Sequence, residues 1–281
     1  MSLVLNEEQT ILKHTAQEFF GANASVAALR ARRDQAQARG FDDDLWRQMV
    51  EMGWPGIIIP EALGGSDFGL TGAVQILECA GRALAASPLL SSAMVAPSVL
   101  LQGEAADRHR ALLEQIARGE VVVALAVDEQ GRHNPAHNKT VVQASGSASV
   151  LDGSKVFVAD GSEADYLIVV CGGPDETGLY LVATNAPGVT RTTTRLVDSG
   201  CEANFEFSQV QLKADDRIAV GAQAAQALAC GLDAGRVGLA AEMLGIALEA
   251  FERTVAYLKL REQFDVPIGS FQALKHRAAI M

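Results

Sequence analysis

The sequence contains little cysteine, and its cysteines are scattered. Its four cysteines, none in a C-x-x-C pair, are Cys79, Cys171, Cys201 and Cys230. This distribution argues against a disulfide framework and a zinc site, and reduced thiols in a cytoplasmic protein are expected. His133 and His137 are four residues apart, but Pro135 between them and the lack of a third ligand argue against a metal site.

A long apolar run and an excess of basic residues are also missing. No apolar stretch reaches membrane-spanning length, and the first residues, MSLVLNEE, lack the basic region and cleavage motif of a signal peptide. The net charge is −11, from 23 Lys and Arg against 34 Asp and Glu. No nucleic-acid or membrane partner is therefore expected, and the expected location is the cytoplasm.

Common catalytic and phosphate-binding motifs are absent. The sequence has no Walker loop, no G-x-G-x-x-G and no serine–histidine–acid set. Residues 64–69, Gly-Gly-Ser-Asp-Phe-Gly, lack the strand-then-helix context of a ligand loop, so a structural turn is favoured. The residue chemistry alone predicts an α+β protein that could bind a nucleotide.

The first part of the chain has helical patterns. Asn6 and Gln9 form a capping-box pattern, and Asp42 or Asp43 is expected to cap a later helix. Further helices are expected over residues 70–86, 91–101 and about 106–118.

From Glu120 the pattern changes to short β-branched runs separated by turns, and Asp152-Gly153 is a hairpin signal. The expected strands are residues 121–127, 140–143, 149–151, 156–158, 166–170, 179–182, 189–193 and 205–212. Their close spacing predicts a small antiparallel barrel or sandwich.

From Ala222 to about Leu260 the helical period returns, with so few polar positions that a bundle or a subunit interface is favoured. A second helix begins near Phe271 and reaches Met281 without a cap, which predicts either a truncated chain or a covering partner. The fold class is therefore α+β. We expect an N-terminal all-α domain over residues 1–119, a middle β-domain over residues 120–215, and the start of an incomplete α-helical domain over residues 216–281.

The corner between the last two helices carries the most specific pattern. Asp265 and Pro267 are expected to end the first helix, and Ser270 to cap the second. The corner presents a guanidinium, two carboxamides and a ring, from Arg261, Gln263, Gln272 and Phe264. This combination suits a phosphate-bearing ligand with a flat ring. On spacing alone, the alternative is a helical hairpin with an apolar core and a surface arginine.

With Arg-x-Gln-Phe-x-x-Pro-Ile-x-x-Phe-Gln-x-x-x-His at residues 261–276, the chain resembles the acyl-CoA dehydrogenase family. Residues 60–65, 80–82, 152–155 and 232–236 resemble further family segments, so the similarity covers essentially the whole chain. The resemblance implies an FAD-dependent oxidoreductase of lipid metabolism that removes two hydrogens from the α,β-bond of an acyl-CoA. It also implies a homo- or hetero-oligomer, dimer or tetramer, and an electron-acceptor flavoprotein as a partner.

The resemblance assigns roles to single residues. Arg261 would pair with the FAD pyrophosphate of the neighbouring subunit, because a guanidinium binds such an anion bidentately. Gln263 and Gln272 would hydrogen-bond the same cofactor, and Phe264 would pack against its adenosine half. Arg236 would lie near the acyl-CoA entrance.

The expected flavin-facing strands depart from the family pattern. Where the family has Thr-Glu-Pro, this chain is expected to have Val127-Asp-Glu, so valine replaces a hydroxyl. Where the family has Trp-Ile-Thr, the chain has Phe157-Val-Ala159, which keeps the aromatic ring and loses a second hydroxyl. Val127, Phe157 and Ala159 are thus the remaining cofactor-binding candidates, and each lost hydrogen bond costs about 1 kcal/mol.

No catalytic base is identified. One branch of the family has its glutamate just before the arginine, where this chain has Gly235, and the more common position lies past Met281. The first hypothesis is a dehydrogenase whose glutamate lies in a missing segment, and the second is a non-catalytic subunit that completes a partner's FAD site. Weaker hypotheses are oxygen chemistry with a reduced flavin and a role in assembly alone. The sequence does not indicate which acyl-CoA is used.

Overall fold

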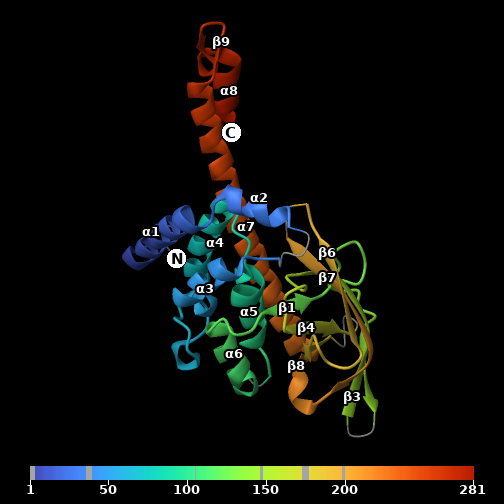
Figure 1. The fold of residues 1–281 in the computed structure, drawn as a ribbon. Helices are drawn as coiled ribbons and strands as arrows, with labels where there is room; N and C mark the ends of the chain where they lie inside the picture. Colours follow the sequence, from blue (N-terminus) through green and yellow to red (C-terminus); the bar gives the residue numbers. More distant parts are fainter. Residues whose placement is uncertain (1–3, 36–39, 105, 146–147, 173–176, 198–199) are drawn as a thin grey trace.

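The computed structural model describes residues 4–35, 40–104, 106–145, 148–172, 177–197 and 200–281. A group of helices lies beside a pair of β-sheets, and one long helix passes between them and projects from the body as an arm (Figure 1). The helices of the described residues include none long and apolar enough to cross a bilayer.

Short helices make up the N-terminal part. They are α1 (Glu7–Asn23), α2 (Val26–Arg33), α3 (Asp43–Glu51), η1 (Trp54–Gly56), η2 (Glu61–Leu63), α4 (Gly69–Ala83), η3 (Leu89–Val95), α5 (Ala96–Leu100), η4 (Ala106–His109) and α6 (Arg110–Ala117). The capping box of Asn6 with Gln9 is confirmed, and Asp42 caps α3 by accepting from the N–H of Leu45 at 2.9 Å. These caps satisfy amides that the first turn of a helix leaves unpaired.

The β-part consists of two four-stranded sheets. One has the order β1 (Val123–Ala126), β4 (Tyr166–Cys171), β5 (Gly178–Ala183) and β8 (Arg217–Val220), and the other has the order β2 (Val141–Ser145), β3 (Ala148–Ala159), β7 (Cys201–Leu212) and β6 (Val189–Arg195). Every pair in the two sheets is antiparallel except β1 with β4, which is parallel. The α+β fold class is confirmed. Strand β8 lies beyond the boundary predicted at residue 215.

The expected hairpin at Asp152-Gly153 is wrong. Both residues lie inside β3, where the pairing with β7 shifts between Leu151 and Gly153. Gly153 has a φ of 145°, and a Cβ there would lie 2.6 Å from the Cα of Thr140. The glycine therefore allows a β-bulge and a close backbone approach, because only a residue without Cβ fits.

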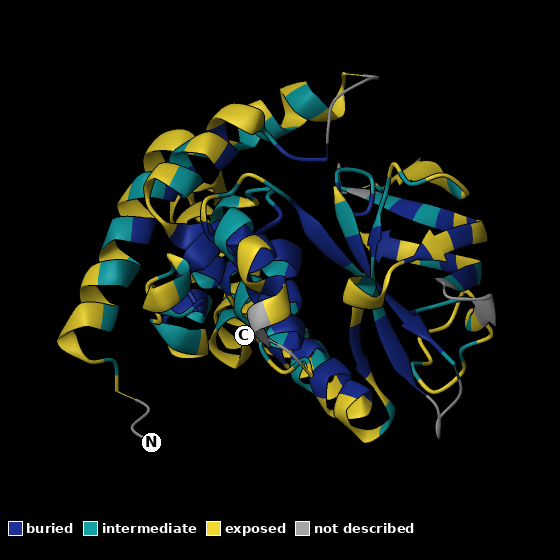
Figure 2. Ribbon diagram, turned by 90° about the horizontal axis from the view of Figure 1, so that it is seen from below, coloured by how far each residue is buried: buried dark blue, intermediate teal, exposed yellow. Residues whose placement is uncertain are grey.

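Two apolar clusters hold the helices and sheets together. The first includes Phe20 and Trp54 from the helical part and Phe205 from β7. The second includes Ile168 from β4 and Leu228 from the long helix. Figure 2 shows buried residues concentrated where the strands face the helices. Because both clusters contain helices and strands, the β-domain is fixed relative to the base of the long helix.

The long helix α7 (Gly221–Leu260) confirms the predicted helix over residues 222–260 and is about 60 Å long at 1.5 Å per residue. It crosses α4 closely: a Cβ on Gly245 would lie 1.9 Å from the carbonyl oxygen of Glu78. Arg82 of α4 then binds Glu249 at 3.0 Å and also Glu252. The rest of α7 forms the arm (Figure 1).

The end of the arm differs from the expectation in two details. Helix α7 ends at Leu260, before Asp265 and Pro267, because the chain enters a hairpin of β9 (Glu262–Gln263) and β10 (Val266–Pro267). Its two turn residues, Phe264 and Asp265, both have positive φ, as a tight two-residue hairpin turn requires.

The expected cap at Ser270 is also wrong. Ser270 lies in the short turn η6 (Ile268–Ser270), and α8 (Gln272–Ile280) begins after Phe271 without a side-chain cap. Ser270 is therefore part of η6 and does not cap α8.

Candidate functional site

The end of the arm brings together four predicted cofactor residues. Arg261, Gln263, Phe264 and Gln272 are all exposed there. The N–H of Ile268 donates to the carbonyl oxygen of Arg261 at 2.7 Å, which closes the corner. Phe264 is 86% exposed, and its ring meets that of Phe271 edge-on with 6.1 Å between the ring centroids. A guanidinium, two amides and a ring are thus all exposed at this end of the arm.

The predicted residues of the β-domain lie elsewhere and do not share one face. Phe157 and Ala159 alternate on the exposed face of β3, and Phe157 is 54% exposed. Val127 instead packs inside the core, so its side chain does not reach that face. These residues lie in the body of the molecule, whereas the corner lies at the far end of the arm (Figure 1). One chain therefore does not place both groups around one ligand.

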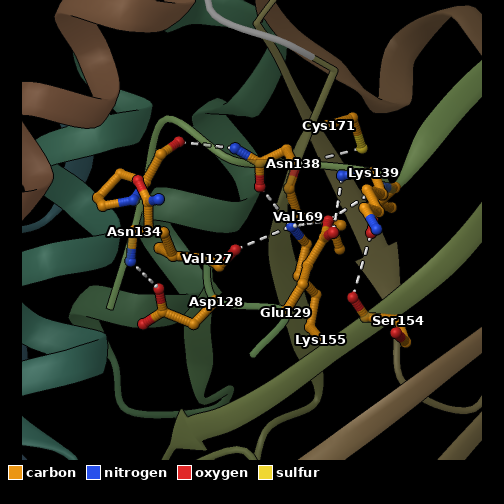
Figure 3. Close-up of polar contacts among 12 residues, drawn as sticks. Val127, Asp128, Glu129, Asn134, Asn138, Lys139, Ser154, Lys155, Val169 and Cys171 are labelled. Carbon is orange, nitrogen blue, oxygen red and sulfur yellow. Dashed lines mark hydrogen bonds and ion pairs between the residues drawn. The ribbon is translucent and has the colours of Figure 1, made fainter. Parts of the chain in front are cut away.

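A buried ionic network behind these strands was not predicted (Figure 3). Lys155 has no exposed side-chain surface, and its Nζ donates to the carbonyl oxygen of Val127 at 2.9 Å, to Glu129 at 2.9 Å and to Asn138 at 2.7 Å. Burial lowers the pKa of Lys155, and the hydrogen bond to Glu129 opposes this effect. The sequence contains a lysine and a glutamate 26 residues apart, and nothing in that spacing shows that they meet.

Glu129 is the centre of this network. Besides Lys155, it accepts from the backbone N–H of Lys139 at 2.7 Å and of Thr140 at 2.9 Å. Burial opposes ionisation of Glu129, but the hydrogen bonds from Lys155 and Thr140 outweigh it and lower the pKa to about 2. The carboxylate therefore fixes both ends of the loop that joins β1 to β2.

Asp128 fixes the same loop from its outer side. Its carboxylate lies 2.7 Å from Nδ1 of His133 and accepts from the N–H of Asn134 at 2.9 Å. Its carbonyl oxygen accepts from the N–H of Val156 at 2.8 Å, next to Phe157. His133 thus pairs with an acid rather than with His137, and no cluster of three possible metal ligands occurs in the part of the chain that the structure describes.

Helix α7 carries the predicted substrate residue and a position without a side chain. Arg236 is exposed and binds Asp233 at 2.6 Å. At Gly235, an added Cβ would lie 3.2 Å from a methyl group of Val95. Glu249 and Glu252 bind Arg82, so both have structural partners.

Two other acids lie between α7 and the end of β3. Burial and the nearby charge of Asp160 raise the pKa of Glu242 to about 7. Burial raises the pKa of Asp160 to about 6, although the Ser91 hydroxyl donates to its carboxylate. Asp160 directly follows Ala159, the last residue of β3.

Comparison with known proteins gives the family context of this geometry. A model described as "Acyl-CoA dehydrogenase, N-terminal domain" matches residues 6–120, and one described as "Acyl-CoA dehydrogenase, C-terminal domain" matches residues 221–281. Acyl-CoA dehydrogenase IpdE2 of Mycobacterium tuberculosis is 31% identical over 278 residues, which cover 97% of this chain and 70% of that protein. Acyl-CoA dehydrogenase FadE27 of the same organism is 30% identical, over 85% of this chain and 62% of that protein.

Solved structures agree with these matches. A variant of the Tcur3481-Tcur3483 steroid ACAD matches with a TM-score of 0.85 and 33% identity, over 97% of this chain and 72% of that one. The ChsE4-ChsE5 complex from Mycobacterium tuberculosis matches with a TM-score of 0.87 and 26% identity, over 100% of this chain and 74% of that one. The present chain therefore spans about two thirds of the length of these relatives.

Proposed function

Because the chain belongs to the acyl-CoA dehydrogenase family, we propose that it is one subunit of an FAD-dependent acyl-CoA dehydrogenase. The reaction removes two hydrogens from the α,β-bond of an acyl-CoA thioester. Bound FAD would supply the acceptor for the hydride that leaves the β-carbon. An electron-acceptor flavoprotein would take the electrons onward, as the resemblance implies. The expected cytoplasmic location stays a prediction that fractionation of source cells would test.

The arm is the observation that carries this proposal. Its corner presents Arg261, two amides and the exposed ring of Phe264. It lies past the ion pair between Arg82 and Glu252, and the eight residues from Glu252 to Leu260 add about 12 Å of helix. A ligand held at this corner is within reach of a neighbouring subunit and far from the β-domain of its own chain.

The residues present fit FAD in part. Arg261 can bind the pyrophosphate bidentately, Gln263 and Gln272 can hydrogen-bond the cofactor, and Phe264 can pack against the adenosine. In the subunit that holds the flavin ring, the exposed Phe157 suits its apolar surface. The polar edge of the flavin ring finds fewer hydrogen-bond partners, because Ala159 has no hydroxyl and the side chain of Val127 packs inside the core.

The other residues of the chain position the reactants in this proposal. Arg236 would bind acyl-CoA near its entrance. The bonds of Lys155 and Glu129 hold the β1–β2 loop against β3, which keeps the ligand-facing surface rigid. Glu249 and Glu252 are not assigned as the base, because both bind Arg82. The acceptor of the α-proton is thus placed outside these residues.

A non-catalytic subunit that completes a partner's FAD site is the second candidate. Three observations favour it. Val127 is buried, Ala159 lacks a hydroxyl, and a side chain at Gly235 would start 3.2 Å from a methyl group of Val95. In addition, two of the similar structures are assemblies of two different proteins, Tcur3481 with Tcur3483 and ChsE4 with ChsE5. In this version the chain supplies its arm and a homologous subunit supplies the base.

The first test replaces the guanidinium of the arm. Arg261→Ala in the purified oligomer is expected to lower the bound FAD per chain at least tenfold, since two charge-assisted hydrogen bonds are lost. Lys259→Ala removes an exposed cation two residues earlier and is expected to keep the FAD. Unchanged flavin absorbance in Arg261→Ala would contradict the role of the corner.

Purification from the native source separates the two candidates. The catalytic dehydrogenase is supported by a homo-oligomer with about one FAD per chain, if an acyl-CoA bleaches the flavin anaerobically. A homologous subunit at equal stoichiometry supports the second. A colourless homo-oligomer would exclude the catalytic dehydrogenase, and a yellow homo-oligomer would exclude the non-catalytic subunit.

A further inference from the structure

Strand β3 contains an irregularity that changes which face its side chains occupy. Lys155 and Val158 are both buried, although residues three apart in a regular strand point to opposite faces of the sheet. The pairing with β7 shifts in register between these two residues, so that Asn204 of β7 lies opposite two residues of β3, Val156 and Phe157. Such a β-bulge inserts one residue into a strand and exchanges the two faces beyond it.

The bulge determines that an aromatic ring reaches the outer face. In an unbroken strand, Phe157 would share the face of Lys155, which is buried. With the bulge, Val158 takes the buried position, and Phe157 and Ala159 are exposed. The ring that the proposed function places against the flavin therefore depends on this one extra residue.

The exposed ring requires an unfavourable backbone conformation. Phe157 has a φ of 53°, in the left-handed region that a bulky residue seldom adopts. Such a conformation persists only where the surrounding contacts hold it. The N–H of Phe157 donates to Oδ1 of Asn204 at 2.9 Å, and the N–H of Val156 donates to the carbonyl oxygen of Asp128 at 2.8 Å. The Asn204 side chain thus supplies an acceptor that the interrupted ladder lacks at the bulge.

A second bulge in the same pair of strands has the same construction. There the extra residue belongs to β7, and Asp152 of β3 lies opposite Ser208 and Gln209. Gln209 has a φ of 55°, and its N–H donates to a carboxylate oxygen of Asp152 at 2.8 Å. In each bulge, the single residue opposite provides a side-chain oxygen for the strained N–H. This repetition indicates that a bulge of this geometry depends on its acceptor.

The far end of the exposed segment is also held. Asp160, the residue after β3, has a φ of 54°, and its carboxylate accepts from the hydroxyl of Ser91 in η3. Residues 157–159 are thus fixed between the contact with Asn204 and the contact with Ser91. Of these two contacts, only that of Asn204 is made by the residue that carries the ring.

We propose that Asn204 is a positioning residue for the flavin ring, because its Oδ1 holds Phe157 in the strained bulge that exposes the aromatic side chain. Asn204 acts through Phe157. The inference rests on the proposed function for the identity of the ligand. The hydrogen bond and the face that it exposes are features of this chain without any ligand.

Hydrogen–deuterium exchange of the full chain, measured by mass spectrometry, tests the hydrogen bond in the absence of flavin. Asn204→Leu removes the acceptor and is expected to speed exchange about tenfold in peptides that cover residues 155–160. Asn204→Asp keeps an oxygen acceptor, as Asp152 does at the second bulge, and should exchange like wild type. Asp152→Leu is the matched control and should speed exchange only around Gln209. Unchanged exchange at residues 155–160 in Asn204→Leu would overturn the proposal.

Titration of the flavin-free oligomer with FAD tests the positioning role. Asn204→Leu is expected to raise the Kd for FAD about fivefold, since the ring no longer lies in place for stacking. Asn204→Asp should restore most of the affinity, and Asp152→Leu should keep the wild-type Kd although it disturbs the same two strands. Equal losses in Asn204→Leu and Asp152→Leu would show a general disturbance of the sheet and overturn the proposal. Thermal unfolding confirms that each variant folds, and Asn204→Ala replaces Asn204→Leu if the latter does not.

Combination with Phe157→Ala shows whether Asn204 acts through the ring. Phe157→Ala should raise the Kd for FAD, and the further change Asn204→Leu should then have no effect, because the two residues act as one unit. Additive effects would overturn the positioning role. FAD binding by wild type with an unchanged Kd in Asn204→Leu would refute this inference alone. A wild-type oligomer that binds no FAD would refute the proposed function, and the exchange experiment would still decide whether Asn204 holds the bulge.

Discussion

Lys155 is a charged residue without exposed side-chain surface, and it tolerates this position because three acceptors surround its Nζ. Burial of a charge is costly unless it is paired and hydrogen-bonded. The partner, Glu129, is only 7% exposed and accepts further backbone N–H groups. The pair therefore stabilises the loop only while both members are present.

Removing one member of the pair should lower the free energy of unfolding much more than removing both. Lys155→Met leaves the carboxylate of Glu129 buried without its cation, and the free energy of unfolding is expected to fall by about 3–5 kcal/mol in urea titrations. Lys139→Met replaces an exposed side chain of the same loop. This variant should change the free energy of unfolding by less than about 0.5 kcal/mol. Lys155→Met/Glu129→Gln is expected to recover part of the loss. A loss below about 1 kcal/mol in Lys155→Met would show that water or another group replaces the lysine.

Glu242 has the opposite electrostatic situation, because burial and Asp160 raise its pKa from 4.5 to about 7. Between these two values the folded state binds a proton that the unfolded state has lost, so this group lowers stability as the pH rises from about 4.5 to 7. Glu242→Gln removes the titration. The stability of the Glu242→Gln variant relative to wild type should increase between about pH 4.5 and 7. The expected increase is about 1–2 kcal/mol after allowance for partial exposure, and the difference should stay level above pH 7.

Thermal unfolding at several pH values measures this difference. Glu51→Gln replaces an exposed carboxylate and should give a flat difference across the same range. A flat difference for Glu242→Gln as well would show that its carboxyl ionises freely in the folded protein.

At the scale of elements, the crossing of α4 and α7 sets the direction of the arm. A Cβ on Gly81 would lie 2.2 Å from the carbonyl oxygen of Glu242, and one on Gly245 would lie 1.9 Å from that of Glu78. Both distances are below van der Waals contact with rigid backbone atoms, so the two helices approach this closely only because both positions are glycine.

Gly245→Val should separate the helices. The expected loss of unfolding free energy is about 3 kcal/mol or more, because the added atoms meet backbone that cannot move aside. Gly235→Ala on the same helix meets one methyl group of Val95 at 3.2 Å and should change stability by less than about 1 kcal/mol, since alanine favours helix. Equal effects of the two changes in denaturant titrations would contradict the tight crossing.

At the scale of the whole molecule, the arm adds nothing to the two core clusters. Its corner and α8 contain no buried residue, whereas the clusters extend only to the first turns of α7 and its crossing with α4. The body should therefore fold without the end of the arm, and the arm should serve contacts between subunits.

Truncation after Leu260 tests this division of roles. The shortened chain is expected to keep its circular dichroism spectrum and to melt within about 2 °C of the full chain, a shift that corresponds to about 1 kcal/mol. Light scattering should show a smaller oligomer, and bound FAD should be lost. A collapse of the fold would show that the arm packs on the body.

The sequence by itself determined the features that depend on local chemistry. Asn6 and Asp42 cap helices because their side-chain oxygens reach amides three residues on. Apolar periodicity gave α7 its bounds within one residue at its start. The polar groups of the corner come from neighbouring positions, so the short turn that joins two helices is enough to bring them to the same end of the arm.

Only the tertiary structure decided the features that depend on partners distant in the chain. Asp152-Gly153 forms a bulge because β7 lies beside it, although the same dipeptide favours a hairpin locally. Lys155 meets Glu129 only when β3 packs beside the β1–β2 loop. The separation of the corner from β3 follows from the direction that the α4–α7 crossing gives the arm. Local patterns determine elements, but contacts between elements depend on packing that no short stretch encodes.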